Sequence, residues 1–221
     1  MNLHAVIFTH PPDYAAAALA VQALQRHAIP VTLAVDEAHA PPEIAGVAVA
    51  ITTFPRNGNL NGRACLDGEL ALFETIDCDA VLVVDSDTLV LDPDRFYREL
   101  PHHPLVGHCW GTLPFLGCCY GIRRSSIPAY RTAIAEHPET DGPEDLMLWQ
   151  LSAILGIEPY RLPHSKAGPG LTIWNWHTKL TPADYLARFE VITVQRNFHV
   201  KDPDLSRAQV VARMQSILNV L

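Results

Sequence analysis

Residues 79 to 87 read Asp79-Ala80-Val81-Leu82-Val83-Val84-Asp85-Ser86-Asp87, an aliphatic run that ends abruptly in two carboxylates. A strand that is buried on both faces is expected to read as such a run, without alternating polar residues. The polar end is therefore predicted to lie at the carboxyl end of a central strand. Open α/β sheets bind their ligands in the crevice outside these strand ends.

Strand and helix patterns alternate through the first half of the chain. The expected strands are Leu3–Thr9, Val31–Val35, Val47–Phe54 and Ala80–Val84, and the expected helices are Asp13–His27 and Arg63–Ile76. Residues 56 to 62, rich in Asn and Gly, read as a loop. This βαβ alternation predicts an α/β protein with a mostly parallel, Rossmann-like sheet and helices on both faces.

The second half of the chain is more mixed, and prolines mark several of its helix starts. The expected strands are Leu105–Trp110, Gly117–Ile122 and Phe189–Val200, and the expected helices are Ile127–Glu136, Pro143–Leu155, Thr181–Arg188 and Asp202–Leu218. At 221 residues the chain is expected to form one domain over residues 1–221.

Composition excludes several classes of protein. Hydrophobic residues make up 48% and charged residues 18%, which is too apolar for a disordered chain. The formal net charge of -8 argues against a nucleic-acid partner, which would need a basic face. The five cysteines show no CxxC spacing and are expected to be buried, reduced thiols. Residues 1–9 do not resemble a signal peptide and no stretch is apolar enough to span a membrane, so we expect a cytoplasmic protein.

Asp85 and Asp87 are candidate ligands of a divalent cation. Mg²⁺ and Mn²⁺ prefer oxygen ligands, and they are usually bound by one or two carboxylates together with substrate phosphates. Residues two apart in a strand point the same way, so both carboxylates can face one cation. The alternative is a solvated turn at the strand end, because Asp and Ser favour turns.

The segment Val81 to Val90, with Asp85-Ser86-Asp87 at its centre, resembles the DxD segment of nucleotide-sugar glycosyltransferases with the A-type, Rossmann-like fold. Upstream, residues 57–76 resemble the segment that precedes this motif in the family. The first strand ends at Phe8-Thr9-His10, where the family binds its nucleotide base. The resemblance implies a nucleotide-binding half over residues 1–100 and an acceptor-side half over residues 101–221.

Three downstream segments extend the resemblance. Residues 117–124, Gly-Cys-Cys-Tyr-Gly-Ile-Arg-Arg, are similar to the family's small-residue strand leading into an arginine near the sugar and acceptor. Glu144-Asp145 resembles the pair that supplies the catalytic base in many inverting members, although here Pro143 precedes it. His199-Val200-Lys201 is similar to the late histidine and lysine that complete the metal site and contact the diphosphate.

These segments imply three sets of site residues. The metal ligands would be Asp85, Asp87 and His199. The nucleotide and diphosphate contacts would be Thr9, His10, Asn59, Arg63, Asp85, Ser86 and Lys201. The catalytic residues would be Asp145 and Glu144, which in the first turn of a helix can also simply complement its positive end.

The resemblance implies a glycosyltransferase that depends on Mn²⁺ or Mg²⁺ and moves a sugar from a nucleoside diphosphate sugar, with UDP favoured. The acceptor hydroxyl would belong to a glycan, a lipid-linked glycan or a small molecule. The late histidine is typical of retaining members and the Glu-Asp pair of inverting members, so both stereochemical outcomes stay open. A non-catalytic binding module of the same fold is the main alternative. A phosphatase of the haloacid dehalogenase type fits less well, because its nucleophile motif usually opens the chain.

Overall fold

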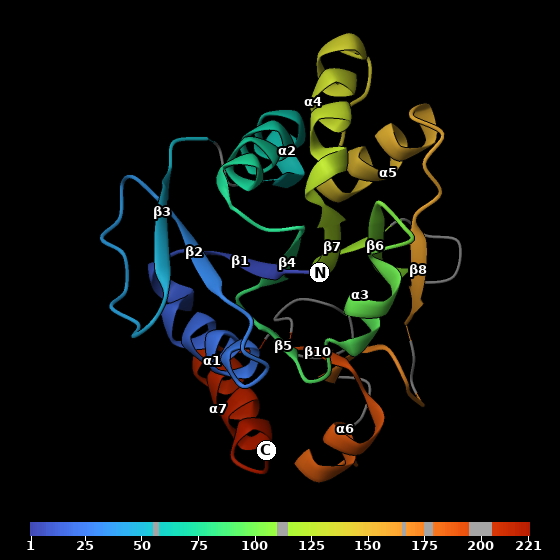
Figure 1. Ribbon diagram of the computed structural model, residues 1–221. Helices are drawn as coiled ribbons and strands as arrows, with labels where there is room; N and C mark the ends of the chain where they lie inside the picture. The colour runs from blue at the N-terminus through green and yellow to red at the C-terminus, as the bar shows by residue number, and fades with distance from the viewer. Residues whose placement is uncertain (55–57, 110–114, 165–166, 175–178, 195–204) are drawn as a thin grey trace.

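A seven-stranded sheet forms the centre of the structure, in the order β3-β2-β1-β4-β7-β6-β8 (Figure 1). The computed structural model describes residues 1–54, 58–109, 115–164, 167–174, 179–194 and 205–221. The strands of this sheet are β1 (Leu3–Thr9), β2 (Val31–Asp36), β3 (Ala48–Thr52), β4 (Ala80–Asp85), β6 (Leu105–Cys109), β7 (Phe115–Arg123) and β8 (Tyr160–Pro163). Within this sheet β7 runs antiparallel to both of its neighbours and the other pairings are parallel, which confirms the mostly parallel prediction.

A second sheet of three short strands lies on one side of the central sheet (Figure 1). Its strands are β5 (Thr88–Val90), β10 (Val191–Thr193) and β9 (Leu171–Ile173), in that order. Only Ser86 and Asp87 separate β5 from the end of β4. The sequence did not predict β5 or β9, because a strand of three residues carries little periodic signal. Of the predicted strand Phe189–Val200, the described part is strand only at β10.

Helices cover both faces of the central sheet, as predicted (Figure 1). One face carries α1 (Tyr14–Gln25), α3 (Asp94–Glu99), α6 (Pro182–Arg188) and α7 (Arg207–Leu218), together with the small sheet. The other face carries α2 (Gly58–Thr75), α4 (Ile127–Glu136) and α5 (Glu144–Ile154). Two short 3₁₀ turns, at Pro11–Asp13 and Arg124–Ser126, precede α1 and α4.

The alternation of β4 between two cores explains its aliphatic run. Leu82 and Val84 pack in the core beneath α1, whereas Val81 and Val83 pack in the core beneath α2 and α4. Because successive side chains of a strand point to opposite faces, a strand covered on both sides must be apolar at every position.

Two helix starts carry clear local signals, although α7 begins at Arg207, five residues later than expected. Thr181 and Ser206 each close a capping box at the start of α6 and α7, in which side chain and backbone exchange hydrogen bonds with the residue three positions on. The predicted loop over residues 56–62 is wrong from Gly58 onward, where α2 already begins with a kink at Asn61. At Gly62 a Cβ would lie 1.8 Å from the carbonyl oxygen of Gly142, so only glycine permits the packing of α2 against the segment before α5.

The cysteine and hydropathy predictions can be compared with the described part of the chain. Cys65, Cys78, Cys118 and Cys119 are free and buried, as expected for reduced thiols. Within the described residues, no helix combines the length and the apolar character that a membrane crossing requires.

Candidate functional site

The carboxyl ends of β1 and β4 lie side by side at one end of the central strands, next to the start of β7. This end of the sheet, around Asp85-Ser86-Asp87, is here called the DxD edge. Phe8 pairs with Asp85 across the parallel β1 and β4, and Val84 pairs with Cys119 across the antiparallel β4 and β7. Thr9, Asp85 and Cys118 therefore lie along this edge on three adjacent strands. The topology thus brings the end of the first strand next to Asp85.

Asp85 and Asp87 lie close to a common neighbour. Burial raises the pKa of the Cys118 thiol, and the negative charges of Asp85 and Asp87 raise this pKa further. Both carboxylates must therefore lie within electrostatic reach of the same thiol. This arrangement agrees with two side chains that point to one side of the strand end.

One carboxylate oxygen of Asp87 is buried without a hydrogen-bond partner among the described residues. Its Oδ1 has no access to solvent and no hydrogen-bond partner in the described part of the chain. Burial raises the pKa of Asp87 to about 6; the nearby Asp13 carboxylate adds to the rise, and the hydroxyls of Thr88 and Thr193 partly oppose it. A buried carboxylate oxygen without a partner is costly, and a raised pKa beside a cavity makes Asp87 a candidate functional residue.

Two residues that the sequence analysis missed lie beside Asp87. Asp13 accepts a hydrogen bond from Arg207 over 2.8 Å and pairs with His10 over 3.2 Å. A cavity of about 90 Å³ adjoins the group and is lined by Pro12, Asp13, Ala16, Asp87, Arg207, Val210 and Val211. Asp13 follows the first strand and could have been noticed from that position, but Arg207 is 194 residues away from it and carries no signal of its own.

The residues at this edge fit a divalent cation. Oδ1 of Asp87 is an orphaned buried oxygen, and Asp85 supplies a second hard carboxylate at the same strand end. In the described part of the chain, no group of three or more His, Cys, Asp or Glu side chains is arranged to hold a metal. Two carboxylates suit Mg²⁺ or Mn²⁺ that takes its remaining ligands from water and substrate phosphates.

Asp145 lies against the start of β7, next to the DxD edge. A Cβ on Gly117 would sit 3.4 Å from the Cβ of Asp145, so the two backbones approach closely. Burial raises the pKa of Asp145, and the backbone amides of Leu146 and Gly117 partly oppose this rise. The Leu146 amide donates to Oδ1 over 2.7 Å. Glu144, in the same first turn of α5, is partly buried.

Of the other predicted nucleotide contacts, Thr9, His10 and Ser86 lie near this edge. Thr9 is buried, and its hydroxyl has no hydrogen-bond partner among the described residues. His10 is exposed beside Asp13, and Ser86 is partly buried between the two aspartates. Asn59 belongs to the first turn of α2.

The guanidinium of Arg63 does not point to this edge. It donates to the carbonyl oxygen of Ile134, and to those of His137 and Thr140 over 2.6 Å each. These carbonyls lie at and just beyond the end of α4, where backbone acceptors lack helical partners. Arg63 therefore binds the end of a helix, and we do not retain it as a phosphate ligand.

The resemblance implied that the arginines at the end of β7 lie near the sugar and acceptor, and the structure places them elsewhere. Arg123 pairs with Ala80, at the end of β4 opposite Asp85. Five residues separate Ala80 from Asp85, which is about 16 Å at the usual rise per residue of a strand. β7 runs antiparallel, so its first residues lie at the DxD edge and its last residues lie at the far edge. Gly117 and Cys118, and not Arg123 and Arg124, thus adjoin the site.

His199 and Lys201 lie outside the described residues, so their roles stay predictions. The chain reaches them from β10, where the Val194 amide donates to the carbonyl oxygen of Asp87 over 2.9 Å. After the undescribed residues 195–204 the chain continues at Leu205, and Arg207 then bonds Asp13. Described residues on both sides of this segment are therefore anchored around Asp87.

Solved structures with the same architecture are glycosyltransferases in several cases. A glycosyltransferase involved in glycosylation of the major capsid of PBCV-1 matches with a TM-score of 0.55 and 11% identity, over 97% of this chain and 99% of that one. The galactosyltransferase LgtC, solved with donor and acceptor sugar analogues, matches with a TM-score of 0.55 and 16% identity, over 98% and 96%. This chain has the glycosyltransferase A-type fold.

The A-type fold is shared more widely than one activity. A 2-C-methyl-D-erythritol 4-phosphate cytidylyltransferase from Thermus thermophilus matches with a TM-score of 0.50 and 16% identity, over 75% of this chain and 90% of that one. No protein-family model and no curated protein sequence matches this chain. At these identities the comparisons establish the A-type fold, and the chemistry has to be argued from the site.

Proposed function

We propose that this protein is a metal-dependent glycosyltransferase that moves a sugar from a nucleoside diphosphate sugar to an acceptor hydroxyl. The observation that carries the proposal is the unpaired, buried Oδ1 of Asp87 beside Asp85, at the carboxyl edge of an A-type sheet. A carboxylate oxygen left without a partner in this position can bind a cation. The glycosyltransferase neighbours make sugar transfer the leading chemistry on this fold.

Asp85 and Asp87 would hold the Mn²⁺ or Mg²⁺, with His199 as a third ligand. The bound cation would neutralise negative charge on the diphosphate leaving group. Thr9 and His10 would contact the nucleotide at the end of β1, together with Ser86 and Asn59. Lys201 would contact the diphosphate. A UDP-sugar is the donor that the resemblance favours.

Asp145 would accept the proton of the acceptor hydroxyl, with Glu144 beside it. Its position against Gly117 places a partly buried carboxylate next to the DxD edge. Its burial raises its pKa, which makes it a stronger base than a solvated aspartate once it is ionised. This role belongs to an inverting reaction, and analysis of the anomeric configuration of the product by NMR tests it. An Asp145→Asn variant that keeps full transfer activity would exclude this role.

Binding of nucleotide is the first experiment. Thermal unfolding is followed with UDP, GDP, ADP, CDP and their sugar conjugates, each with and without Mn²⁺. Because a ligand that binds only the folded state raises the unfolding midpoint, we expect an increase that requires both UDP and Mn²⁺. The matched control is Asp87→Asn, which should lose the increase while remaining folded. An equal response of both proteins would contradict the proposed metal site.

Turnover distinguishes an enzyme from a binding module of the same fold. Hydrolysis of the UDP-sugar without acceptor should depend on Mn²⁺ and on Asp87. Binding without any hydrolysis or transfer, over a panel of glycan and small-molecule acceptors, would favour the binding module. The phosphatase alternative is not favoured, because several structural neighbours are glycosyltransferases.

A further inference from the structure

The two aspartates of the candidate metal site are held by different parts of the fold. Asp85 is the last residue of β4, in the middle of the seven-stranded sheet. Asp87 directly precedes β5, which belongs to the small sheet. The distance between the two carboxylates therefore depends on how the small sheet is fixed relative to the large one.

Strand pairing alone fixes the small sheet weakly. β5 and β10 pair through three residues each, from Val90 opposite Val191 to Thr88 opposite Thr193. Such short strands are marginally stable without further support. A shift of this pairing by one residue would reverse the direction of every side chain, and would also displace the Val194 amide from the Asp87 carbonyl.

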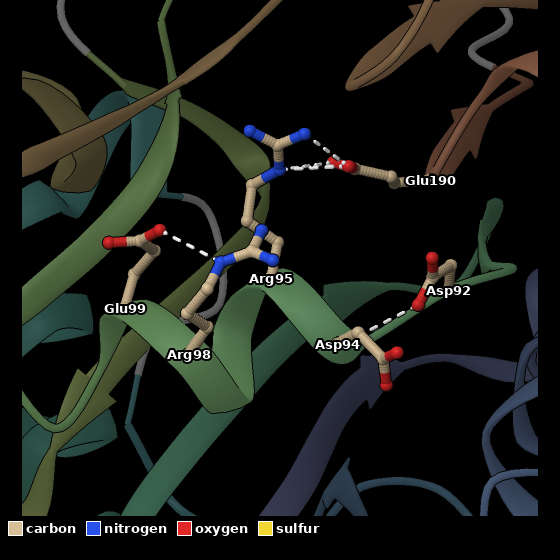
Figure 2. Close-up of polar contacts among 6 residues, drawn as sticks. All are labelled: Asp92, Asp94, Arg95, Arg98, Glu99 and Glu190. Atoms are coloured by element: carbon tan, nitrogen blue, oxygen red, sulfur yellow. Dashed lines mark hydrogen bonds and ion pairs between the residues drawn. The ribbon is translucent and has the colours of Figure 1, made fainter.

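Glu190 joins the small sheet to its surroundings at the end remote from Asp87. Its carbonyl oxygen accepts from the amides of Leu91 and Asp92, just beyond β5, and its own amide donates to Gly170, just before β9. Its carboxylate accepts three hydrogen bonds from Arg95 of α3, at 2.8, 3.0 and 2.6 Å (Figure 2). Both side chains are mostly buried, at 19% exposure for Arg95 and 13% for Glu190.

Helix α3 is in turn packed on the large sheet. A Cβ on Gly121 of β7 would lie 2.8 Å from the side chain of Leu100 and 3.2 Å from that of Phe96. These two side chains therefore pack directly on the backbone of β7, at a residue that has no side chain of its own. Phe96 also meets the ring of His108 on β6 edge-on, with centroids 6.0 Å apart. The fully buried Phe96 and Leu100 leave α3 little freedom to move.

We propose that the Arg95–Glu190 ion pair is a positioning device for the candidate metal site, which sets the placement of Asp87 relative to Asp85. The chain of contacts runs from β7 through α3 to Arg95, from Arg95 to Glu190, and along β10 and β5 to Asp87. A bidentate guanidinium–carboxylate pair is suited to this task because it fixes orientation as well as distance. This inference rests on the proposed function of the DxD edge, and it assigns Arg95 and Glu190 a role without contact to substrate.

The test is Mn²⁺ binding in the presence of UDP, measured by electron paramagnetic resonance of free Mn²⁺ on the full chain. The variants are Glu190→Gln, which keeps the side-chain shape, and Arg95→Lys, which keeps the charge but loses the fork. We expect each to weaken Mn²⁺ binding about 10-fold, the size of effect known for residues that orient metal ligands. Glu99→Gln is the matched control, because Glu99 is about as buried as Glu190, at 15% exposure, but its partner Arg98 is 62% exposed and belongs to the same helix (Figure 2). It should change binding less than about twofold, because this pair does not join α3 to the small sheet.

Circular dichroism identifies a temperature at which the unaltered protein and all variants are folded, and Mn²⁺ binding is measured at that temperature. A lower affinity then cannot be due to unfolding. If Arg95→Lys does not fold, Glu190→Gln alone decides. Folded variants that bind Mn²⁺ as tightly as the unaltered protein would overturn the inference and leave the proposed function intact. Absence of UDP-dependent Mn²⁺ binding by the unaltered protein would overturn both.

Discussion

The two ends of the small sheet treat buried charge in opposite ways. At the start of β10, the carboxylate of Glu190 accepts three hydrogen bonds from the guanidinium of Arg95. At the start of β5, Oδ1 of Asp87 is buried without a hydrogen-bond partner among the described residues. A fold that can pair charge fully at one end of three-residue strands leaves it unpaired at the other. This difference is what the proposed metal site requires, because a carboxylate oxygen without a partner can bind a cation.

Removal of the Asp87 carboxylate should have the largest effect on activity. We expect Asp87→Asn to reduce Mn²⁺-dependent hydrolysis of the donor by at least about 100-fold, because the cation loses a ligand. The measurement is release of UDP from the donor at saturating Mn²⁺. Glu99→Gln serves as the control. Donor hydrolysis within a fewfold of that of the unaltered protein would remove Asp87 from the metal site.

The same substitution should stabilise the metal-free protein. A pKa raised from 3.8 to about 6 corresponds to about 3 kcal/mol at roughly 1.4 kcal/mol per pKa unit. The folded state binds the proton more tightly than the unfolded chain, so this carboxylate costs nothing below about pH 4, and its cost grows until about pH 6. The stability advantage of Asp87→Asn, from urea unfolding in the presence of EDTA, should therefore be near zero at pH 4 and about 3 kcal/mol at pH 7. A difference in the free energy of unfolding that stays constant from pH 4 to pH 7 would show that the pKa of Asp87 is not raised in the folded protein.

The paired end should respond in the opposite direction. Glu190→Ala leaves the mostly buried guanidinium of Arg95 without its carboxylate, and we expect a loss of about 2–3 kcal/mol in the free energy of unfolding. Urea unfolding at pH 7 measures the loss. An Arg95→Met, Glu190→Met double variant should recover part of it, because no lone charge is then buried. A neutral or stabilising effect of Glu190→Ala would erase the contrast between the two ends.

Arg63 gives the smallest expected effect and tests the same distinction elsewhere. Its guanidinium binds three backbone carbonyls around the end of α4. Arg63→Ala should lower the free energy of unfolding by about 1–2 kcal/mol, a typical cost for losing charge-assisted hydrogen bonds on a partly exposed side chain. UDP affinity in the presence of Mn²⁺, measured by calorimetry, should stay within twofold. A UDP affinity reduced more than tenfold would restore Arg63 to the nucleotide site.

Sequence reasoning succeeded where a local pattern carries the physical constraint. The aliphatic run before Asp85 predicted a central strand, because burial on both faces excludes polar residues. It failed where long-range pairing decides. Arg123 was placed at the acceptor site, but the antiparallel direction of β7 carries it to the far edge. Arg63 was assigned to phosphate because it opens a predicted helix, but its partners lie more than 70 residues away.

The sequence by itself determined that this is an α/β protein and that Asp85 and Asp87 stand at the end of a buried strand, since hydrophobic periodicity is a local property. Only the tertiary structure decided that Asp13 and Arg207 lie beside Asp87, that Gly117 backs Asp145, and that Arg95 meets Glu190. Each of these contacts joins segments that are distant along the chain. Their proximity follows from sheet order and strand direction, which no single segment encodes.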